Sequence, residues 1–414
     1  MRTRLMISGV LLCIQPLTTQ ATSLQSVLEA VASTHPELQM ADQQVRSASG
    51  NRDEQTAYAY NPELSLEPQR RRLNGGGKTN DYYITLSQGI EIGGKRGYRA
   101  QSAEAALNAA RQRRELVHQQ LISKAAKAYV QLYFANQAYT LRRQQSDMLA
   151  RVNHAVSQKL ALGEASRLDT NLASSAYASA LNATVVASQQ LMQAKQQYLL
   201  ALGQSQGVVQ LSELVMPQLD TGWQPPEDAY HIALESRPDL AALRAKLRQF
   251  NAQAELAGAA RIPDITLSAM TGREAGDQLI KVGVTVPLPV LNSHRGAYEA
   301  ALAQSERAST GLAWSEQQLR FAVDSAVQNH ANAMQALANA QQSGMQKSAQ
   351  ETITLAQKAY DAGEIDLEEL VVHIRQGLDA RMTALEIIRQ GWLTRIRLAE
   401  VLGHSEYILK GTHS

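Results

Sequence analysis

The sequence Asn61-Pro62-Glu63-Leu64-Ser65-Leu66 returns in outline about 200 residues later as Ile262-Pro263-Asp264-Ile265-Thr266-Leu267. Three further pairs of landmarks keep the same order and nearly the same spacing: His35-Pro36-Glu37-Leu38 with Arg237-Pro238-Asp239-Leu240, Lys95-Arg96-Gly97 with His294-Arg295-Gly296, and Gly163-Glu164 with Gly363-Glu364. A repeat of this length is far longer than a solenoid unit. The sequence therefore predicts an internal duplication, with the two halves at residues 24–203 and 229–403. An irregular linker at 204–228 joins the halves, and residues 404–414 form a C-terminal tail that we expect to be frayed from Lys410 onward.

Each half changes from a helical to a strand-like hydrophobic period just after the repeated proline. Tyr82, Ile84 and Leu86 alternate with polar residues in the first half, and Val282 and Val284 do so in the second. We expect hairpin strands at about 61–92 and 262–290, with turns at 70–81 and 272–277. Each hairpin would then have one apolar and one polar face.

A very long helical stretch follows each hairpin. Residues 97–162 contain no proline and no internal glycine, which predicts a helix roughly 100 Å long. A second helix returns to residue 202, and the second half repeats this pair at 296–402, with Gly311 and Gly344 as weak points. Aromatic residues make up only 5% of the chain, so these helices favour coiled-coil walls over a packed globular core. At the strand-to-helix junctions, Gly93-Gly94 in the first half and Pro287 and Pro289 in the second would set the angle.

The N-terminus has the pattern of a secretory signal peptide over residues 1–23. Arg2 and Arg4 precede a short apolar stretch that contains Cys13, the only cysteine of the chain. The exported chain would therefore form no disulfide. No later run of about 18 apolar residues predicts a transmembrane helix. The net charge of +2, without a basic block, gives no reason to expect nucleic acid as a partner.

The apolar faces of the hairpins need a cover. In a soluble protein they would meet a core, and in an outer-membrane barrel they would meet lipid. Nothing else in the sequence is apolar enough to cover them, which favours the barrel. Four strands cannot close a barrel, because known single-chain barrels have at least about eight. Three chains would supply twelve strands, so we expect a homotrimer.

Taken together, these features resemble the TolC-type outer membrane efflux proteins, most of all their CzcC-like cation-efflux branch. The resemblance covers nearly the whole exported chain and rests on the duplicated landmarks together with two junction motifs, Ser87-Gln88-Gly89-Ile90-Glu91 with Gly93-Gly94-Lys95-Arg96, and Val286-Pro287-Leu288-Pro289. It implies a mixed α/β membrane protein: a trimeric twelve-stranded barrel in the outer membrane of a Gram-negative cell, and a long helical tunnel in the periplasm. It also implies a periplasmic adaptor and an inner-membrane pump, often of the resistance–nodulation–division class, as partners. The function would be a passive exit duct, for heavy-metal cations or, alternatively, for drugs or for type I protein secretion.

The resemblance places the gate and the adaptor contact at the turns that join the paired helices. The residues concerned are Leu162, Gly163, Glu164 and Asp169 at the first turn, and Asp361, Gly363, Glu364 and Asp366 at the second. The two glycines would supply the left-handed residue of the turn. In a trimer each carboxylate would form a ring of three, which favours cations. For Asp169 and Asp366, helix capping is an equally good explanation.

Other chemistry is weakly indicated. No two of His118, His154, His330 and His373 stand three or four residues apart, so we expect exposed helix histidines and no metal site. Gly89–Arg96 approximates a phosphate-binding loop, but Arg96 stands where Ser or Thr would hold magnesium. We therefore expect neither a cofactor nor catalysis, although a secreted nucleotide-binding enzyme remains an alternative. A periplasmic coiled-coil adaptor or scaffold is another alternative, which the duplication disfavours.

Overall fold

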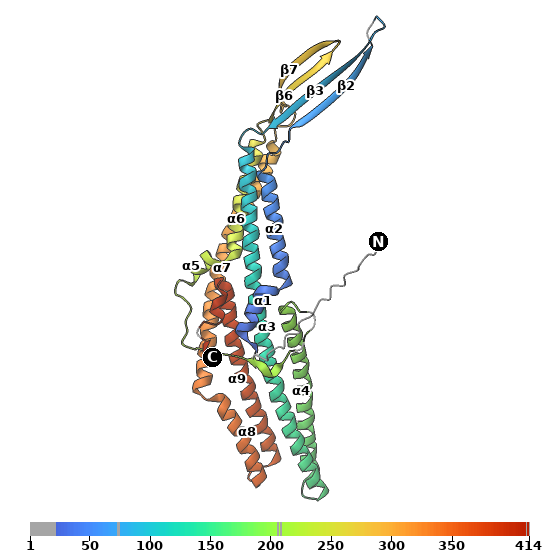
Figure 1. Cartoon of the computed structure of the whole chain (residues 1–414). Helices are drawn as coiled ribbons and strands as arrows, with labels where there is room; N and C mark the ends of the chain where they lie inside the picture. The colour runs from blue at the N-terminus through green and yellow to red at the C-terminus, as the bar shows by residue number, and fades with distance from the viewer. Residues whose placement is uncertain (1–21, 73–74, 205–206, 208, 411, 414) are drawn as a thin grey trace, which may run out of the picture.

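The computed structural model describes residues 22–72, 75–204, 207, 209–410 and 412–413. Nearly all of the predicted signal peptide therefore lies outside the described residues. The molecule is strongly elongated, with a sheet at one end and the turns of two helix pairs at the other (Figure 1). No helix within the described ranges is long and apolar enough to cross a membrane.

The two halves contain the same series of elements. The first half consists of α1 (Leu24–Thr34), α2 (Pro36–Thr56), β2 (Glu63–Arg72), β3 (Lys78–Ile90), α3 (Lys95–Ala161) and α4 (Arg167–Ala201). The second half consists of α5 (Ala229–Ser236), α6 (Pro238–Ala259), β6 (Ile265–Glu274), β7 (Asp277–Thr285), α7 (Arg295–Gln342), α8 (Met345–Ala362) and α9 (Leu367–Leu402). The short remaining elements are β1 (Thr22–Ser23), η1 (Leu211–Glu213), β4 (Leu214–Val215), β5 (Gln218–Leu219), η2 (Ser405–Ile408) and β8 (Thr412–His413). The first helix of each half breaks before its repeated proline, because Pro36 and Pro238 suit the first turn of a new helix.

The four long strands form one antiparallel sheet in the order β2-β3-β6-β7. The central pair β3–β6 joins the halves, with Ser87 opposite Ser268. The apolar side chains of this sheet are exposed, as in Val282 at 85%. The predicted alternation and the lack of a cover for it are thus confirmed for the described chain.

The predicted turns were too long. β2 continues to Arg72 and β3 begins at Lys78, and in the second half only Ala275 and Gly276 separate the strands. Ion pairs extend the hairpins beyond the apolar stretch: Arg71 lies 3.2 Å from the buried Asp81 carboxylate and 2.5 Å from that of Glu274. Gly75, Gly76 and Gly77 indicated a turn over 70–81, whereas the Glu274 partner of Arg71 lies 203 residues away and is not visible in the local pattern.

The helices near the sheet follow the same order as the strands. α2 packs against α3, α3 against α6, and α6 against α7. The contact between α3 and α6 joins the halves, and small side chains such as Ala103 and Ala245 are buried there. The same part of α7 is open, because Leu319 is the first buried residue of that helix.

Ion pairs join α2 to α3 and α6 to α7, and two of these pairs place opposite charges at corresponding positions of α2 and α6. Arg114 on α3 donates to Asp42 on α2 at 3.0 Å. Arg244 on α6 donates to Glu316 on α7, also at 3.0 Å. Asp42 and Arg244 lie at the same distance along the chain from Pro36 and Pro238, so they occupy corresponding places on α2 and α6.

The long helix is continuous in the first half and broken in the second. α3 runs for 67 residues, whereas α7 ends at Gln342 and α8 begins at Met345. Gly344 between them is left-handed, with φ of 59°, while the helix passes through Gly311 without interruption. Only one of the two predicted weak points therefore breaks the helix.

The linker and the C-terminal residues cross the helices near the middle of the molecule (Figure 1). Arg395 of α9 is fully buried, and its guanidinium lies 3.5 Å from the Trp223 ring centroid of the linker. It also donates to the carbonyl of Lys410 at 3.0 Å. Thr412 and His413 pair with β5 of the linker, so the expectation of a frayed end from residue 410 is wrong for these two residues.

Candidate functional site

The first strand-to-helix junction is held by a carboxylate from the other half. Asp264, which follows the repeated proline of the second half, accepts hydrogen bonds from the Lys95 ammonium at 2.7 Å and the Tyr60 hydroxyl at 2.8 Å. The backbone N–H of Ile92 also donates to it at 3.2 Å. These contacts fix the end of the hairpin and the first residue of α3 to the second half.

The Asp264 carboxylate is ionised under most conditions. Burial acts to raise its pKa, but the hydrogen bonds from Lys95 and Tyr60 outweigh this effect, and the pKa lies below its ordinary value. The Lys95 side chain is only 11% exposed, so each charge depends on the other for compensation.

This contact bears on the nucleotide-binding alternative. The Lys95 ammonium, which would have to reach a phosphate, is occupied by Asp264. The strand before it belongs to an antiparallel sheet, whereas a phosphate-binding loop follows a strand of a parallel one. Gly93 and Gly94 instead adopt left-handed conformations, with φ of 74° and 76°, and turn the chain from β3 into α3.

The second junction uses a different residue for the same turn. His294 directly precedes α7 and is left-handed, with φ of 56°, as Gly94 is before α3. Pro287 and Pro289 lie earlier, in the segment between β7 and α7. The structure therefore matches His294 with Gly94 and Arg295 with Lys95, one position away from the match predicted by sequence.

The first helix-pair turn is closed by hydrogen bonds. Gly163 is left-handed, with φ of 79°, and the N–H of Glu164 donates to the Lys159 carbonyl at 2.8 Å. Ser166 and Asp169 form a reciprocal cap at the start of α4. The hydroxyl and then the backbone N–H of Ser166 lower the pKa of Asp169.

The second turn repeats this geometry. Gly363 is left-handed, with φ of 77°, and the N–H of Glu364 donates to the Ala359 carbonyl at 2.8 Å. Asp366 caps α9 by accepting from the N–H of Glu369 at 2.8 Å. Asp169 and Asp366 thus both cap helices, whereas Glu164, Asp361 and Glu364 are exposed at the ends of the molecule.

The two turns differ in their exposed apolar side chains. Leu162 and Leu168 of the first turn are 74% and 77% exposed. The nearest leucine of the second turn, Leu367, is buried in the cluster that packs the two helix pairs together. Leu168 was not among the predicted site residues, because a single leucine in a helical stretch reads as core.

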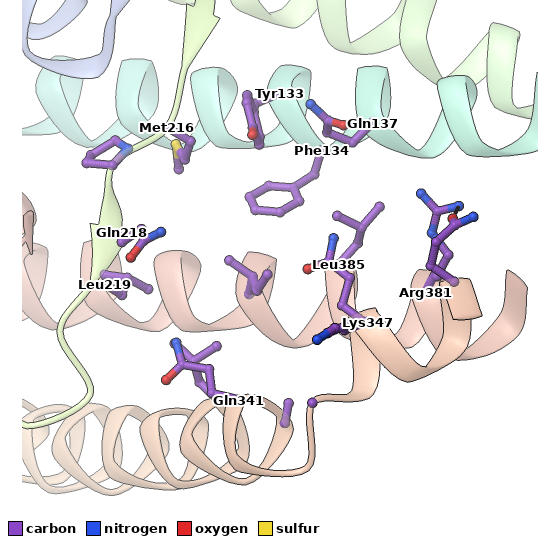
Figure 2. A pocket seen from close by; sticks show the side chains of 18 residues that line it. Tyr133, Phe134, Gln137, Met216, Gln218, Leu219, Gln341, Lys347, Arg381 and Leu385 are labelled. Carbon is purple, nitrogen blue, oxygen red and sulfur yellow. Dashed lines mark hydrogen bonds between the residues drawn. The ribbon is translucent and has the colours of Figure 1, made fainter. Parts of the chain in front are cut away.

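A cavity of about 800 Å³ adjoins the break between α7 and α8. Figure 2 shows Tyr133 and Phe134 of α3 facing it on one side, Met216 and Gln218 of the linker at one end, and Arg381 of α9 at the other. Gly344 lines the same space. The left-handed residue that breaks the helix therefore borders this cavity.

Of the four helix histidines, His154 is exposed as expected, His118 and His373 are half-buried, and His330 differs most from the prediction. His330 is fully buried against Trp223, and burial, followed by the nearby Arg395, lowers its pKa to about 4. The expectation of an exposed side chain is wrong there, because the linker covers this face of α7. Within the described residues, no three His, Cys, Asp or Glu side chains come together as metal ligands would.

Comparisons with known proteins agree with this architecture. The family model described as outer membrane efflux protein matches residues 27–204 and 229–404. The cobalt-zinc-cadmium resistance protein CzcC of Cupriavidus metallidurans is 23% identical over 383 residues, which are 92% of this chain and 90% of that protein.

Solved structures show the same fold. A membrane protein from Pseudomonas aeruginosa superimposes with a TM-score of 0.78 at 18% identity, over 92% of this chain and 93% of that one. The Campylobacter jejuni CmeC outer membrane channel gives 0.77 at 17% identity, over 92% and 85%. Because the family model covers both halves of the duplicated chain, the protein belongs to the outer membrane efflux protein family.

Proposed function

We propose that this protein is the passive outer-membrane duct of a tripartite exporter and that it works as a homotrimer whose twelve strands close a barrel. The observation that carries the proposal is that the two halves pair with each other through one strand and one helix each. The equivalent strands and helices at the outer edges of the described chain are left without such a partner. β3 pairs with β6 and α3 packs on α6. The corresponding edges, β7 with α7 and β2 with α2, have no such partner within the described chain.

The outer surfaces of α7 and α2 expose large apolar side chains, as surfaces that become buried in an interface do. Trp314 and Phe321 of α7 are 58% and 76% exposed, and so is Met40 of α2 at 60%. Exposed apolar surface of this kind marks sites of association. A ring in which β7 and α7 of one protomer meet β2 and α2 of the next would cover it, as a heterologous interface that closes.

The ring can be tested by a disulfide whose position follows from the repeat. Inside the chain Thr85 lies opposite Met270. The corresponding pair between chains is Thr285 with Gln69, and residues directly opposite on neighbouring strands bring their Cβ atoms within about 5 Å. In a Cys13→Ser background, Thr285→Cys with Gln69→Cys should give covalent dimers and trimers on a denaturing gel.

The matched control is Thr85→Cys with Met270→Cys, which should form its bond within one chain and leave the apparent mass unchanged. Failure of the first pair to cross-link in membranes, together with a monomeric detergent-solubilised protein, would refute the trimer.

The cargo that we propose is divalent heavy-metal cations. The similarity to a protein named for cobalt, zinc and cadmium resistance supports this class of cargo. Exposed carboxylates at both turns, among them Glu164 and Glu364, would line the periplasmic mouth with negative charge. Energy would come from an inner-membrane pump of the resistance–nodulation–division class, through a periplasmic adaptor that docks on the exposed Leu162 and Leu168.

Resistance profiling tests cargo and docking together. A deletion strain should become sensitive to zinc, cobalt and cadmium, and the wild-type gene should restore resistance. A variant with Leu162→Asp and Leu168→Asp should fail to restore it although its trimer still forms, because charged side chains would disrupt an apolar contact. If only sensitivity to drugs or dyes changed, the metal assignment would be wrong.

A further inference from the structure

The residues of the internal junction have counterparts near the two edges of the sheet. Asp264 directly follows the repeated proline of the second half, and Glu63 follows that of the first. Asp264 is held by Tyr60 and Lys95 of the first half. The residues that hold Glu63 should therefore be the second-half counterparts of Tyr60 and Lys95.

Those counterparts are both arginines. Arg261 stands two residues before the repeated proline, as Tyr60 does in the first half. Arg295 is the first residue of α7, as Lys95 is of α3. Where the internal junction has one cation and one neutral phenol, the corresponding place between chains would have two guanidiniums.

We propose that Glu63 of one protomer binds Arg261 and Arg295 of the next, so that three such ion-pair clusters lock the trimer where strands become helices. The inference rests on the proposed trimeric ring and identifies residues by which its neighbours recognise each other. The partner is a second copy of this chain, since Glu63 begins the edge strand β2, whereas Arg261 precedes β6 and Arg295 follows β7, the opposite edge strand of the sheet.

The isolated chain leaves these groups available. Glu63 and Arg261 are exposed, and neither side chain has a hydrogen-bond or ion-pair partner within the described ranges. Arg295 contacts Glu299 one turn along its own helix, at 2.7 Å. Such an exposed pair contributes little and does not prevent the guanidinium from binding a second carboxylate.

A surface carboxylate with no partner, opposite two arginines, is electrostatically complementary and selects the neighbour. The cluster would hold the start of β2 against the start of α7 of the next protomer, as Asp264 holds the end of β3 against the start of α3. Barrel and tunnel would then be joined at six places in the ring, three within chains and three between them.

Charge reversal tests the cluster. Glu63→Arg alone, or Arg261→Glu with Arg295→Glu, should lower by several degrees the temperature at which the detergent-solubilised trimer dissociates to monomer on a mildly denaturing gel. Combining all three reversals should restore the wild-type dissociation temperature. If the single reversals acted by unfolding the protein, combining them would not restore it. Glu67→Arg, which reverses a charge on the same face of the same strand, should leave the temperature unchanged.

The outcomes separate the cluster from the function. Reversals without effect on dissociation, while the disulfide between Thr285→Cys and Gln69→Cys still forms, would overturn the cluster and leave the duct intact. The cluster would equally be overturned if the triple reversal dissociated at the temperature of the single one. Absence of a trimer in the wild-type protein would instead overturn the proposed function.

Discussion

Linking the second helix-pair turns of neighbouring protomers is expected to abolish export. In a Cys13→Ser background, Glu364→Cys joined between chains by a bifunctional thiol-reactive reagent with a disulfide in its spacer should reduce metal resistance to that of the deletion strain. The physical reason is the break at Gly344: α8 leads directly into this turn, and the left-handed residue between α7 and α8 is a point at which we expect α8 to pivot. The cavity beside Gly344 gives the movement room.

The matched variant is Glu164→Cys at the first turn, joined by the same reagent. There α3 continues without a break for 67 residues, so this turn has no comparable hinge. We expect most of the resistance to remain, and a reductant that cleaves the link should restore the rest. Equal loss of export from both links would show that the hinge does not set which turn opens.

Replacing Asp264 by alanine is expected to lower the free energy of unfolding by about 3 kcal/mol, because it leaves the nearly buried Lys95 ammonium without a counter-ion. The variant should also assemble poorly, since the same carboxylate fixes the hairpin to α3. The midpoint of denaturant unfolding in detergent measures the first effect, and the trimer yield measures the second.

Two comparisons sharpen this test. Glu63→Ala removes the corresponding carboxylate of the first half, which has no partner inside the described chain, and should leave the stability of the monomer unchanged. The effect of Asp264→Ala should shrink in acid: because folding lowers the pKa of Asp264, its contribution is complete above the ordinary carboxyl pKa and is lost as pH falls through the folded value. A penalty that stayed constant down to that pH would contradict the ion-pair explanation.

The order of elements could be predicted because it depends on local signals. The alternation around Ile84 and Val284, the repeated prolines and the long proline-free stretches each determine their own element. The helix caps could be predicted for the same reason: Asp169 and Asp366 stand at the starts of helices, next to glycines that end the preceding ones.

What the sequence concealed depends on contacts between distant residues. Asp264 and Lys95 are 169 residues apart, so their ion pair leaves no local pattern. The segment around Lys95, taken alone, resembled a phosphate-binding loop. His330 looked exposed because the linker that covers it is remote in sequence and irregular. The left-handed His294 was hidden by an alignment that matched it with Lys95, since no sequence pattern marks a non-glycine residue in that conformation.

The opposite charges of Asp42 and Arg244, at corresponding places on α2 and α6, have a consequence for folding. A duplicated chain contains two nearly interchangeable helices, α2 and α6, either of which could dock first on a long helix as the chain collapses. If α6 took the place of α2 on α3, Arg244 would face Arg114, and α2 in the place of α6 on α7 would set Asp42 against Glu316. Like charges at contact distance penalise both exchanges. The opposite charges of Asp42 and Arg244 thus favour the native pairing of each helix over the exchanged pairing, although α2 and α6 are copies of one repeated segment.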